Sequence, residues 1–222
     1  MNPNAPPPEP ARVILVDKPL EWTSFDVVKK IKYALKIRKI GHAGTLDPLA
    51  TGLLILCTGK MTKQIEKYQA QEKEYTGTFV IGATTASFDL ETEVINHKEY
   101  GHITQSDVSK AAEKLTGDIE QIPPIFSAIK VGGKRAYESA RKGEEIKLKS
   151  RKVNIKKFEV LKFENSEVHF KIVCSKGTYI RSMARDFGEL LGIGAYLSSL
   201  RRTRIGEFKV EQASTIEEII TT

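Results

Sequence analysis

The sequence contains one carboxylate whose surroundings favour a chemical role. Asp47 is followed by Pro48, lies between Gly44 and Gly52, and precedes an apolar run at residues 53–57. Glycine lets the backbone approach a ligand closely or adopt a positive φ, and functional groups often occupy loops held on a rigid scaffold. A carboxylate held in this way could act as a nucleophile or stabilise positive charge that develops during a reaction. The alternative is a simple turn before a core strand, since Asp-Pro often begins turns.

The elements that would position this loop are those of a mixed α/β chain. The run at 53–57 predicts a buried strand, and residues 13–16 predict a shorter one. Thr23 or Ser24 is expected to cap a helix. Four apolar residues share one face of this helix, namely Phe25, Val28, Ile31 and Leu35. Further along, we expect helices at 62–72, 106–115, 180–190 and 215–220, and strands at 74–81 and 168–172.

Composition and charge restrict the classes of function. The 222-residue chain is long enough for a substantial core, and its net charge of +7 favours a polyanionic partner such as a nucleic acid. Cys57 and Cys174 lie far apart in apolar runs, which indicates buried free thiols in a reducing compartment. No apolar run is long enough to cross a bilayer. Residues 1–11 are rich in proline and lack the apolar core of a signal peptide, so we expect a disordered tail and a cytoplasmic protein.

Basic residues are concentrated in two segments. The first covers much of the predicted first helix and the residues directly after it: Lys29, Lys30, Lys32, Lys36, Arg38 and Lys39. The second occupies residues 141–157: Arg141, Lys142, Lys147, Lys149, Arg151, Lys152, Lys156 and Lys157. Such runs are often only a solvated surface. Because the first leads directly into the Asp47 loop, and the second comes after a Pro-Pro segment at 123–124, we interpret both as surfaces for a phosphate backbone.

Six segments in a fixed order resemble one known family. Residues 41–52, GHAGTLDPLATG, resemble the catalytic-aspartate motif of the TruB-type tRNA pseudouridine synthases, G-H-x-G-x-L-D-P-x-A-x-G. Residues 16–24 resemble the family's D-K-P-x-G-x-[ST]-S motif, with Glu21 where glycine is usual. Residues 73–77 resemble its K-x-Y strand, and residues 121–141 resemble the insertion that clasps the tRNA T loop. Residues 174–182 match its S-x-G-T-Y-I-R motif, and residues 194–204 resemble the family segment found directly after that motif.

This resemblance implies a fold and a domain organisation. It predicts an α+β pseudouridine synthase fold, in which helices flank a mixed or antiparallel central sheet and a thumb-like RNA-binding insertion spans residues 121–152. Residues 12–208 would form the catalytic domain. Typical members continue into a C-terminal RNA-binding domain of the PUA type. Residues 209–222 are too few for an independent core, so we expect only a short C-terminal tail there.

The resemblance also implies a reaction, the isomerisation of uridine 55 in the T loop of tRNA to pseudouridine. The reaction breaks the C1′–N1 bond, turns the uracil and rejoins it through C5. Nothing is oxidised, hydrolysed or phosphorylated, so we expect no cofactor and no metal. One carboxylate suffices, and Asp47 matches the family's catalytic aspartate. A glycosidase would need a second carboxyl group, and none stands near Asp47 in the sequence.

Further residues receive roles through the same resemblance. Tyr75 would stack on the flipped-out base, and Arg181 would pair with Asp47. His42 would help to hold the T loop of the tRNA open. The full set that we expect to bind the substrate is Tyr75, Arg181, His42, Tyr179, Lys18 and Leu200. The set that we expect to bind RNA is Lys130, Arg135, Arg141, Lys147, Lys149, Arg151 and Lys152.

Other functions remain as alternatives at this level. A pseudouridine synthase could act on another structured RNA such as ribosomal RNA, and a non-catalytic RNA-binding module would also explain the charge. A nucleotide-binding loop at residues 52–60 is disfavoured, because the glycine spacing is wrong and Met61 replaces the required Ser or Thr. The expected partner is the T arm of tRNA. We expect a monomer without an obligate protein partner and without membrane contact.

Overall fold

The computed structural model describes residues 11–127, 130–131, 134–135 and 148–221. The packing of Cα atoms divides the chain into two compact units. The first consists of Met1–Lys73 and Arg201–Thr222, and the second of Glu74–Leu200. The region expected to form one catalytic domain therefore contributes to both units, and Asp47 belongs to the first.

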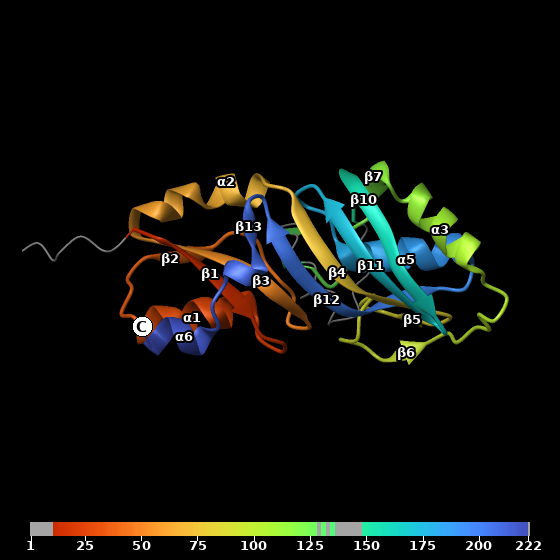
Figure 1. Cartoon of the computed structure of the whole chain (residues 1–222), viewed down its shortest axis with the longest axis horizontal. Helices are drawn as coiled ribbons and strands as arrows, with labels where there is room; N and C mark the ends of the chain where they lie inside the picture. Colours follow the sequence, from red (N-terminus) through yellow and green to blue (C-terminus); the bar gives the residue numbers. More distant parts are fainter. Residues whose placement is uncertain (1–10, 128–129, 132–133, 136–147, 222) are drawn as a thin grey trace, which may run out of the picture. The chain divides into compact units, whose positions relative to one another are not determined.

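The first unit is built around strand β3 (Ala50–Thr58), which lies beside β1 (Val13–Lys18) and β12 (Ala195–Ile205) in the strand order (Figure 1). Strands β1 and β3 are antiparallel, and their register runs from Val13↔Cys57 to Lys18↔Gly52. The short strands β2 (Ile40–His42) and β13 (Phe208–Lys209) pair with β3 and β12. The loop between β2 and β3 carries Asp47, so both of its ends are fixed in the sheet.

Alternate residues of β3 enter two different hydrophobic clusters. Leu54 and Leu56 pack with residues of α1 (Ser24–Ala34) and α6 (Ile216–Thr221). Leu53, Ile55 and Cys57 pack instead with Met61 of the 3-10 helix η1 (Gly59–Gln64), with Ile65 and Tyr68 of α2 (Ile65–Ala70), and with Val210 of the 3-10 helix η2 (Val210–Gln212). Helices therefore cover both faces of β3 (Figure 1). Burial on both faces explains why the strand is continuously apolar, as predicted for residues 53–57.

Helix α1 starts where the sequence indicated, but one of the four residues placed on its apolar face, Phe25, is exposed. Thr23 is the N-cap and forms a capping box with Asp26. Val27 and Ile31 are fully buried, whereas Phe25 is 67 % exposed. The buried face contains Ser24, Val27, Val28 and Ile31, which follow the spacing i, i+3, i+4 and i+7. Phe25 lies outside this series, so its ring faces solvent.

The second unit contains the remaining large strands. In the strand order, β4 (Lys73–Ile81) is followed by β11 (Glu167–Cys174), β10 (Arg151–Glu164) and β7 (Gly117–Gln121). Its main helices are α3 (Gln105–Lys114) and α5 (Ile180–Leu191). The described residues of this unit also include two short antiparallel strand pairs: β5 (Thr84–Thr85) with β6 (Val94–Ile95), and β8 (Lys130–Val131) with β9 (Lys134–Arg135). The predicted strands and the helices predicted at 106–115, 180–190 and 215–220 are confirmed, with small differences at their ends. The segment predicted as one helix at 62–72 is instead the end of the 3-10 helix η1 followed by the short helix α2.

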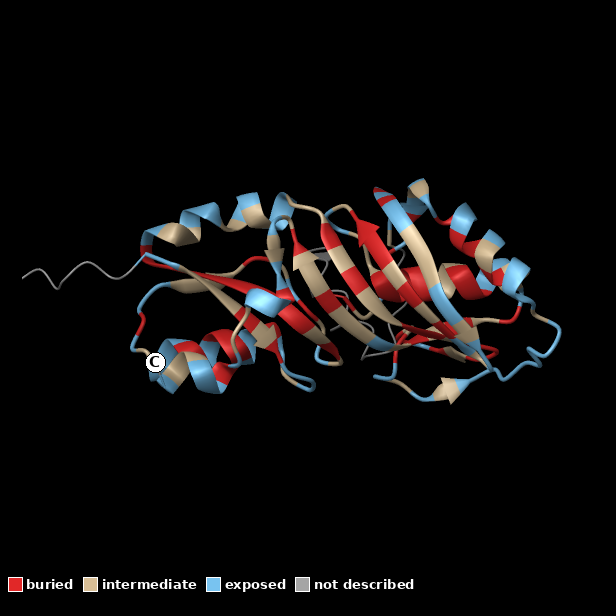
Figure 2. Ribbon diagram, viewed as in Figure 1, coloured by how far each residue is buried: buried red, intermediate tan, exposed pale blue. Residues whose placement is uncertain are grey.

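Aromatic rings form the core beneath α5. The ring centroid of Phe79 lies 4.3 Å from that of Phe170 and 5.6 Å from that of Phe187. All three residues are fully buried, and the inward faces of the strands and of α5 are buried with them (Figure 2). This packing connects the sheet to α5, whose first two residues, Ile180 and Arg181, are the last two of the S-x-G-T-Y-I-R motif.

The segment expected to bind RNA leaves and rejoins the sheet at one point. Strand β7 ends at Gln121 and β10 begins at Arg151, and these two residues are paired in the antiparallel register. Much of the intervening segment lies outside the described residues. Among the residues that are described, no helix is long and apolar enough to cross a membrane.

Replacing Phe79 with alanine should lower the free energy of unfolding by about 3–5 kcal/mol, because truncating a buried Phe leaves a cavity. Denaturant unfolding followed by circular dichroism measures this loss. Leu161 is 53 % exposed and provides the control, since Leu161→Ala should change the free energy by less than about 0.5 kcal/mol. Equal effects of the two substitutions would contradict the proposed position of the core.

Candidate active site

The loop that carries Asp47 is held closely against the first unit. Gly52, at the start of β3, has φ +99°, and a Cβ atom there would lie 2.4 Å from the carbonyl oxygen of Arg202. Both the backbone conformation and the lack of space therefore require glycine at this position. Gly44, on the other side of Asp47, also has φ +99°. The glycines that the sequence singled out are thus needed to shape the loop.

Arg202 binds the backbone on both sides of the loop, although its side chain is only 1 % exposed. Its Nε donates to the carbonyl of Leu53 at 2.8 Å, while Nη1 and Nη2 donate to the carbonyls of Thr45 and Gly44 at 3.3 and 3.2 Å. A guanidinium group suits this task because its donors form a rigid planar fork. Arg202 had no role among those expected from the sequence. The arginine pair at 201–202 was part of a family motif, but nothing in the sequence showed which backbone groups it meets.

Ser24 and Glu21 hold the residues immediately beside Asp47. The buried Oγ of Ser24 accepts from the backbone N–H of Leu46 at 2.8 Å and donates to its carbonyl at 3.1 Å. The backbone N–H of Glu21 donates to the carbonyl of Pro48 at 2.9 Å. Both contacts come from the segment that leads into α1. They fix the chain on each side of the carboxylate.

Lys18 also binds the loop that carries Asp47, through the carbonyl of Pro48. Its side chain is fully buried, and its Nζ donates to the carbonyls of Pro19, Trp22 and Pro48 at 2.8, 2.5 and 3.3 Å. Burial lowers the pKa of Lys18 to about 8, with attraction to Asp47 opposing the shift and repulsion from Arg202 adding to it. We expected Lys18 to bind the substrate. The structure shows that its ammonium group binds the loop backbone, and a contact with the substrate stays a prediction.

His42 lies in β2, just before the loop. Its Nδ1 is buried and has no hydrogen-bond partner among the described residues. Burial lowers the pKa of His42, repulsion from Arg202 lowers it further, and an interaction with the backbone of Gly44 opposes the shift. The neutral imidazole is therefore favoured. The expected role of His42 in holding the T loop of the tRNA open stays a prediction.

The other predicted substrate-binding residues belong to the second unit. Tyr75 lies in β4 and is 8 % exposed, and Leu200 is half-buried in β12. Tyr179 is the N-cap of α5, and Arg181 lies in the first turn of this helix. The structure therefore brings Tyr179 and Arg181 together at one helix terminus.

Arg181 pairs with Asp89, a partner that the sequence did not indicate. Its Nε lies 3.5 Å from Oδ2 of Asp89, and both side chains are nearly inaccessible. Its Nη2 and Nη1 donate to the carbonyls of Phe126 and Ser87 at 2.9 and 3.3 Å. A cation in the first turn opposes the helix dipole, and the carboxylate of Asp89 compensates for this. The predicted pairing of Arg181 with Asp47 joins residues of different units and stays a prediction.

The predicted RNA-binding residues differ in their surroundings. Lys149 and Lys152 are exposed. Arg151 is half-buried, with its Cζ 5.1 Å from the centroid of the Tyr179 ring. Lys130 and Arg135 lie in the strands β8 and β9. The remaining two positions, Arg141 and Lys147, lie outside the described residues.

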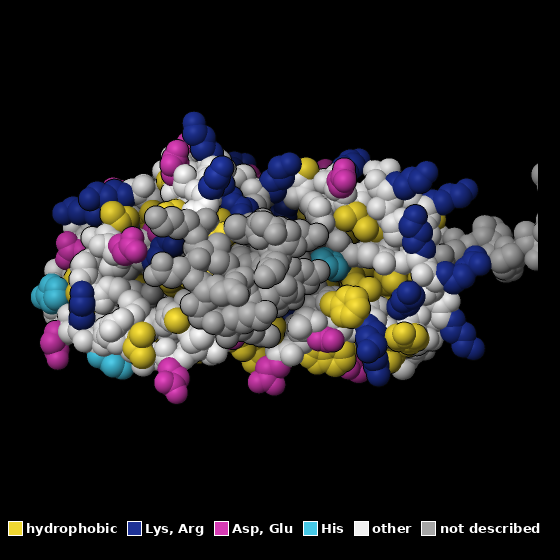
Figure 3. Space-filling model, turned by 180° about the vertical axis from the view of Figure 1, so that it is seen from behind, with side chains coloured by type: hydrophobic (Ala, Val, Ile, Leu, Met, Phe, Trp, Pro, Cys, Tyr) yellow, Lys and Arg dark blue, Asp and Glu magenta, His cyan; other side chains and the backbone are white. Residues whose placement is uncertain are grey.

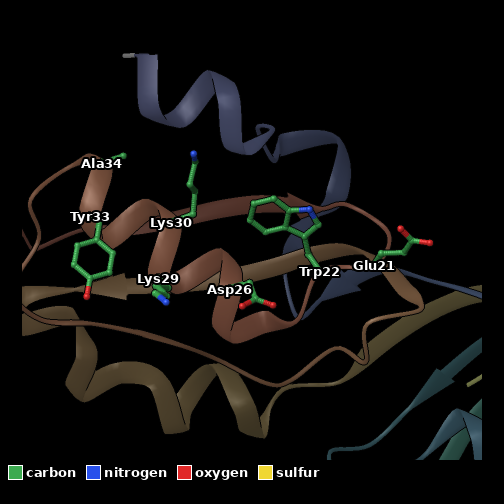
Figure 4. A pocket seen from close by; sticks show the side chains of 7 residues that line it. All are labelled: Glu21, Trp22, Asp26, Lys29, Lys30, Tyr33 and Ala34. Atoms are coloured by element: carbon green, nitrogen blue, oxygen red, sulfur yellow. The ribbon is translucent and has the colours of Figure 1, made fainter.

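Helix α1 and the turn that follows it present the basic surface expected from the sequence. Lys29, Lys30, Lys32 and Lys36 are exposed, and Lys and Arg side chains are numerous over the first unit (Figure 3). An open groove of about 700 Å³ runs along this helix (Figure 4). It is lined by Glu21, Trp22, Asp26, Lys29, Lys30, Tyr33 and Ala34. None of the residues assigned to the reaction lines this groove.

Cys57 and Cys174 are both free thiols and both buried, as predicted. Among the described residues, no three His, Cys, Asp or Glu side chains are grouped so that they could hold a metal ion.

Comparison with known proteins identifies the family. Residues 32–180 match the TruB family pseudouridylate synthase N-terminal domain, and residues 181–222 match the tRNA pseudouridylate synthase B C-terminal domain. The second match begins within α5, well before the tail expected from residue 209.

Similar proteins come from several bacteria. The chain is 53 % identical to the tRNA pseudouridine synthase B of Flavobacterium johnsoniae, over 92 % of this chain and 93 % of the relative. It is 52 % identical to that of Phocaeicola vulgatus, over 92 % of this chain and 90 % of the relative.

A solved structure supports the fold. One chain in the crystal structure of a Cbf5–Nop10–Gar1 complex matches with a TM-score of 0.74 and 31 % identity, over 94 % of this chain. The present chain spans about half, 53 %, of the length of that chain. The expected pseudouridine synthase fold is confirmed, and the chain belongs to the TruB family of tRNA pseudouridine synthases, which are isomerases.

Proposed function

We propose that this protein converts uridine 55 in the T loop of tRNA to pseudouridine, with Asp47 as the catalytic carboxylate. The observation that carries the proposal is the fixed backbone around Asp47. Arg202 binds the carbonyls of residues 44 and 45, and Ser24 binds both backbone groups of residue 46. A loop held so closely can present one carboxylate in a defined position, and positioning contributes strongly to catalysis.

The proposed reaction requires only this carboxylate and a correctly placed uridine. The C1′–N1 bond breaks, and Asp47 attacks C1′ or stabilises the positive charge that develops there. The uracil then turns and forms a bond from C5 to C1′. Where Asp47 is bonded to C1′, this step breaks that bond and releases the carboxylate, and C5 loses a proton while N1 gains one. Atoms and electrons balance without an oxidant, water or a phosphate donor, and so no cofactor is required.

We assign the other residues of the family motifs to the substrate. Tyr75 would stack on the extruded base, because a base within a folded loop must leave its stack before its sugar can be reached. Tyr179 and Arg181 would act at the same uridine, and Leu200 would contribute an apolar contact. His42 would keep the T loop open, and its favoured neutral form suits contact with a base. Lys149 and Lys152 would bind RNA phosphates.

Mapping of pseudouridine in tRNA incubated with the purified protein tests the proposal. We expect a single new pseudouridine at position 55 with the wild type and none with Asp47→Asn. Because amide and carboxylate have nearly the same shape, the variant should still bind tRNA with close to wild-type affinity. Turnover by Asp47→Asn would show that Asp47 is not the catalytic carboxylate. Modification of ribosomal RNA in place of tRNA would support the alternative substrate.

Arg202→Met should lower the rate at saturating tRNA by up to about 100-fold, since displacement of a reacting group by about 1 Å can have this effect. The substitution leaves the carbonyls of residues 44, 45 and 53 without their donor. The matched control is Arg204→Met, which removes an ion pair with Glu72, at 2.7 Å in the same unit. Its rate should remain near that of the wild type. Equal losses in both variants would indicate general destabilisation rather than an effect on the Asp47 loop.

Replacing Lys149 and Lys152 with glutamine should reduce the dependence of tRNA affinity on salt. Each lost phosphate contact should lower the slope of log K against log salt by about 1. Titration of tRNA across a salt series measures this slope. Lys110 and Lys114, exposed on α3, provide a control with the same change in charge, and their replacement should leave the slope unchanged. If the two double variants behave alike, Lys149 and Lys152 are only solvated surface.

A further inference from the structure

Both ends of the RNA-binding insertion meet at Tyr179. Gln121 ends β7 and Arg151 begins β10, and these residues are directly opposite in the register. Gln121 contacts the backbone of Tyr179, and Arg151 contacts its ring. From the sequence, Tyr179 was expected to bind the substrate and Arg151 to bind RNA, whereas Gln121 had no expected role.

Gln121 binds Tyr179 through both the oxygen and the nitrogen of its side-chain amide. Its Oε1 accepts from the backbone N–H of Tyr179 at 2.8 Å, and its Nε2 donates to the carbonyl of the same residue at 3.1 Å. The side chain of Gln121 is fully buried, so loss of these bonds would leave polar groups unsatisfied. This pairing needs a donor and an acceptor on one side chain of the correct length, which glutamine supplies. The backbone of Tyr179 is therefore fixed at the start of α5.

Arg151 lies over the ring of the same tyrosine and restricts the positions that this ring can take. Its guanidinium carbon lies 5.1 Å from the ring centroid, and its Nη1 donates to the carbonyl of Gly177 at 3.4 Å. A planar guanidinium group can stack on an aromatic face and still donate from its edge, which an ammonium group cannot do. Arg151 is thus bound to the motif that contains Tyr179.

Two further contacts attach the first arm of the insertion to α5. Oγ of the buried Ser182 donates to the carbonyl of Ile122 at 2.8 Å. Nη2 of Arg181 donates to the carbonyl of Phe126 at 2.9 Å. The first turn of α5 and residues 121–126 therefore form one hydrogen-bonded group, and a displacement of this arm would be transmitted to Tyr179.

We propose that Gln121 and Arg151 are positioning residues for Tyr179, and that through them the placement of Tyr179 depends on the base of the RNA-binding insertion. The proposal rests on the proposed function, in which Tyr179 contacts the uridine and the insertion contacts RNA. Binding of RNA to the insertion would then stabilise the arrangement of Tyr179 that the reaction needs. Gln121 and Arg151 would affect the rate more than the affinity for RNA.

The experiment separates rate from affinity and compares single with double variants. The variants are Gln121→Met, Arg151→Lys and Tyr179→Ala, together with each of the first two in the Tyr179→Ala background. Single-turnover rates are measured at saturating T-arm RNA, dissociation constants are measured separately, and thermal unfolding checks the fold. Arg151→Lys retains the charge but loses the planar stacking group, and the half-buried position should tolerate it without unfolding.

We expect Gln121→Met and Arg151→Lys to lower the single-turnover rate by about tenfold or more, because small displacements of a substrate contact are costly. The dissociation constant should stay close to that of the wild type. In the Tyr179→Ala background, the same substitutions should have little further effect, since the ring that they position is absent. A residue that only stabilises the fold would instead give losses that multiply in the double variants.

A control comes from the same two strands. Asn154 is paired with Asp118 across β10 and β7, and its Nδ2 donates to Oδ1 of Asp118 at 2.8 Å. Asn154→Ala removes a polar contact between these strands without touching Tyr179, and its rate should equal that of the wild type. A comparable loss in this variant would overturn the proposal, because the effect would not be specific to Tyr179.

The remaining outcomes are also decisive. A wild-type rate for Arg151→Lys together with multiplying losses for Gln121→Met would overturn the positioning role and leave the proposed function intact. A wild-type rate for Tyr179→Ala would show that Tyr179 has no part in the reaction, and this would also overturn the positioning proposal. Absence of pseudouridine after incubation with the wild-type protein would refute the proposed function itself.

Discussion

The arrangement of the first unit depends on one buried cation. The guanidinium group of Arg202 is nearly inaccessible, and it binds carbonyls of the Asp47 loop and of β3. Burial of a charged group is costly unless its donors are satisfied, and these carbonyls satisfy them. The loop conformation and the buried arginine therefore require each other. Neither would be stable if the other were displaced.

Lys18 adds a second buried cation to the same loop. Its lowered pKa reflects its removal from water, and three carbonyls accept hydrogen bonds from its ammonium group. Two cations at this position favour a negative charge nearby, and Asp47 is attracted to Lys18. The polar interior of the first unit thus serves a carboxylate, which agrees with the carboxylate chemistry proposed for the family motif.

The second unit also contains a buried cation, Arg181, at the start of α5. Arg181 lies in the first turn of a helix, where a cation is unfavourable, and Asp89 compensates for it at 3.5 Å. Gln121, Ser182 and Arg181 together bind this turn to residues 121–126. In both units the residues of the family motifs are held by buried polar contacts to the backbone. Such contacts fix position more sharply than apolar packing, because hydrogen bonds are directional.

The sequence by itself determined the family, the reaction class and most of the elements. The buried strand at 53–57 could be predicted because a short continuous apolar run is a local signal. The glycines around Asp47 could be singled out in the same way, and the loop conformation requires them. Tertiary structure decided the rest. Phe25 fits an apolar helix pattern but faces solvent, since the phase of α1 is set by the sheet against which it packs. The partners Arg202, Ser24, Gln121 and Asp89 could not be found from spacing, because each contacts residues far away in the chain, and only the folded backbone brings a donor to its acceptor.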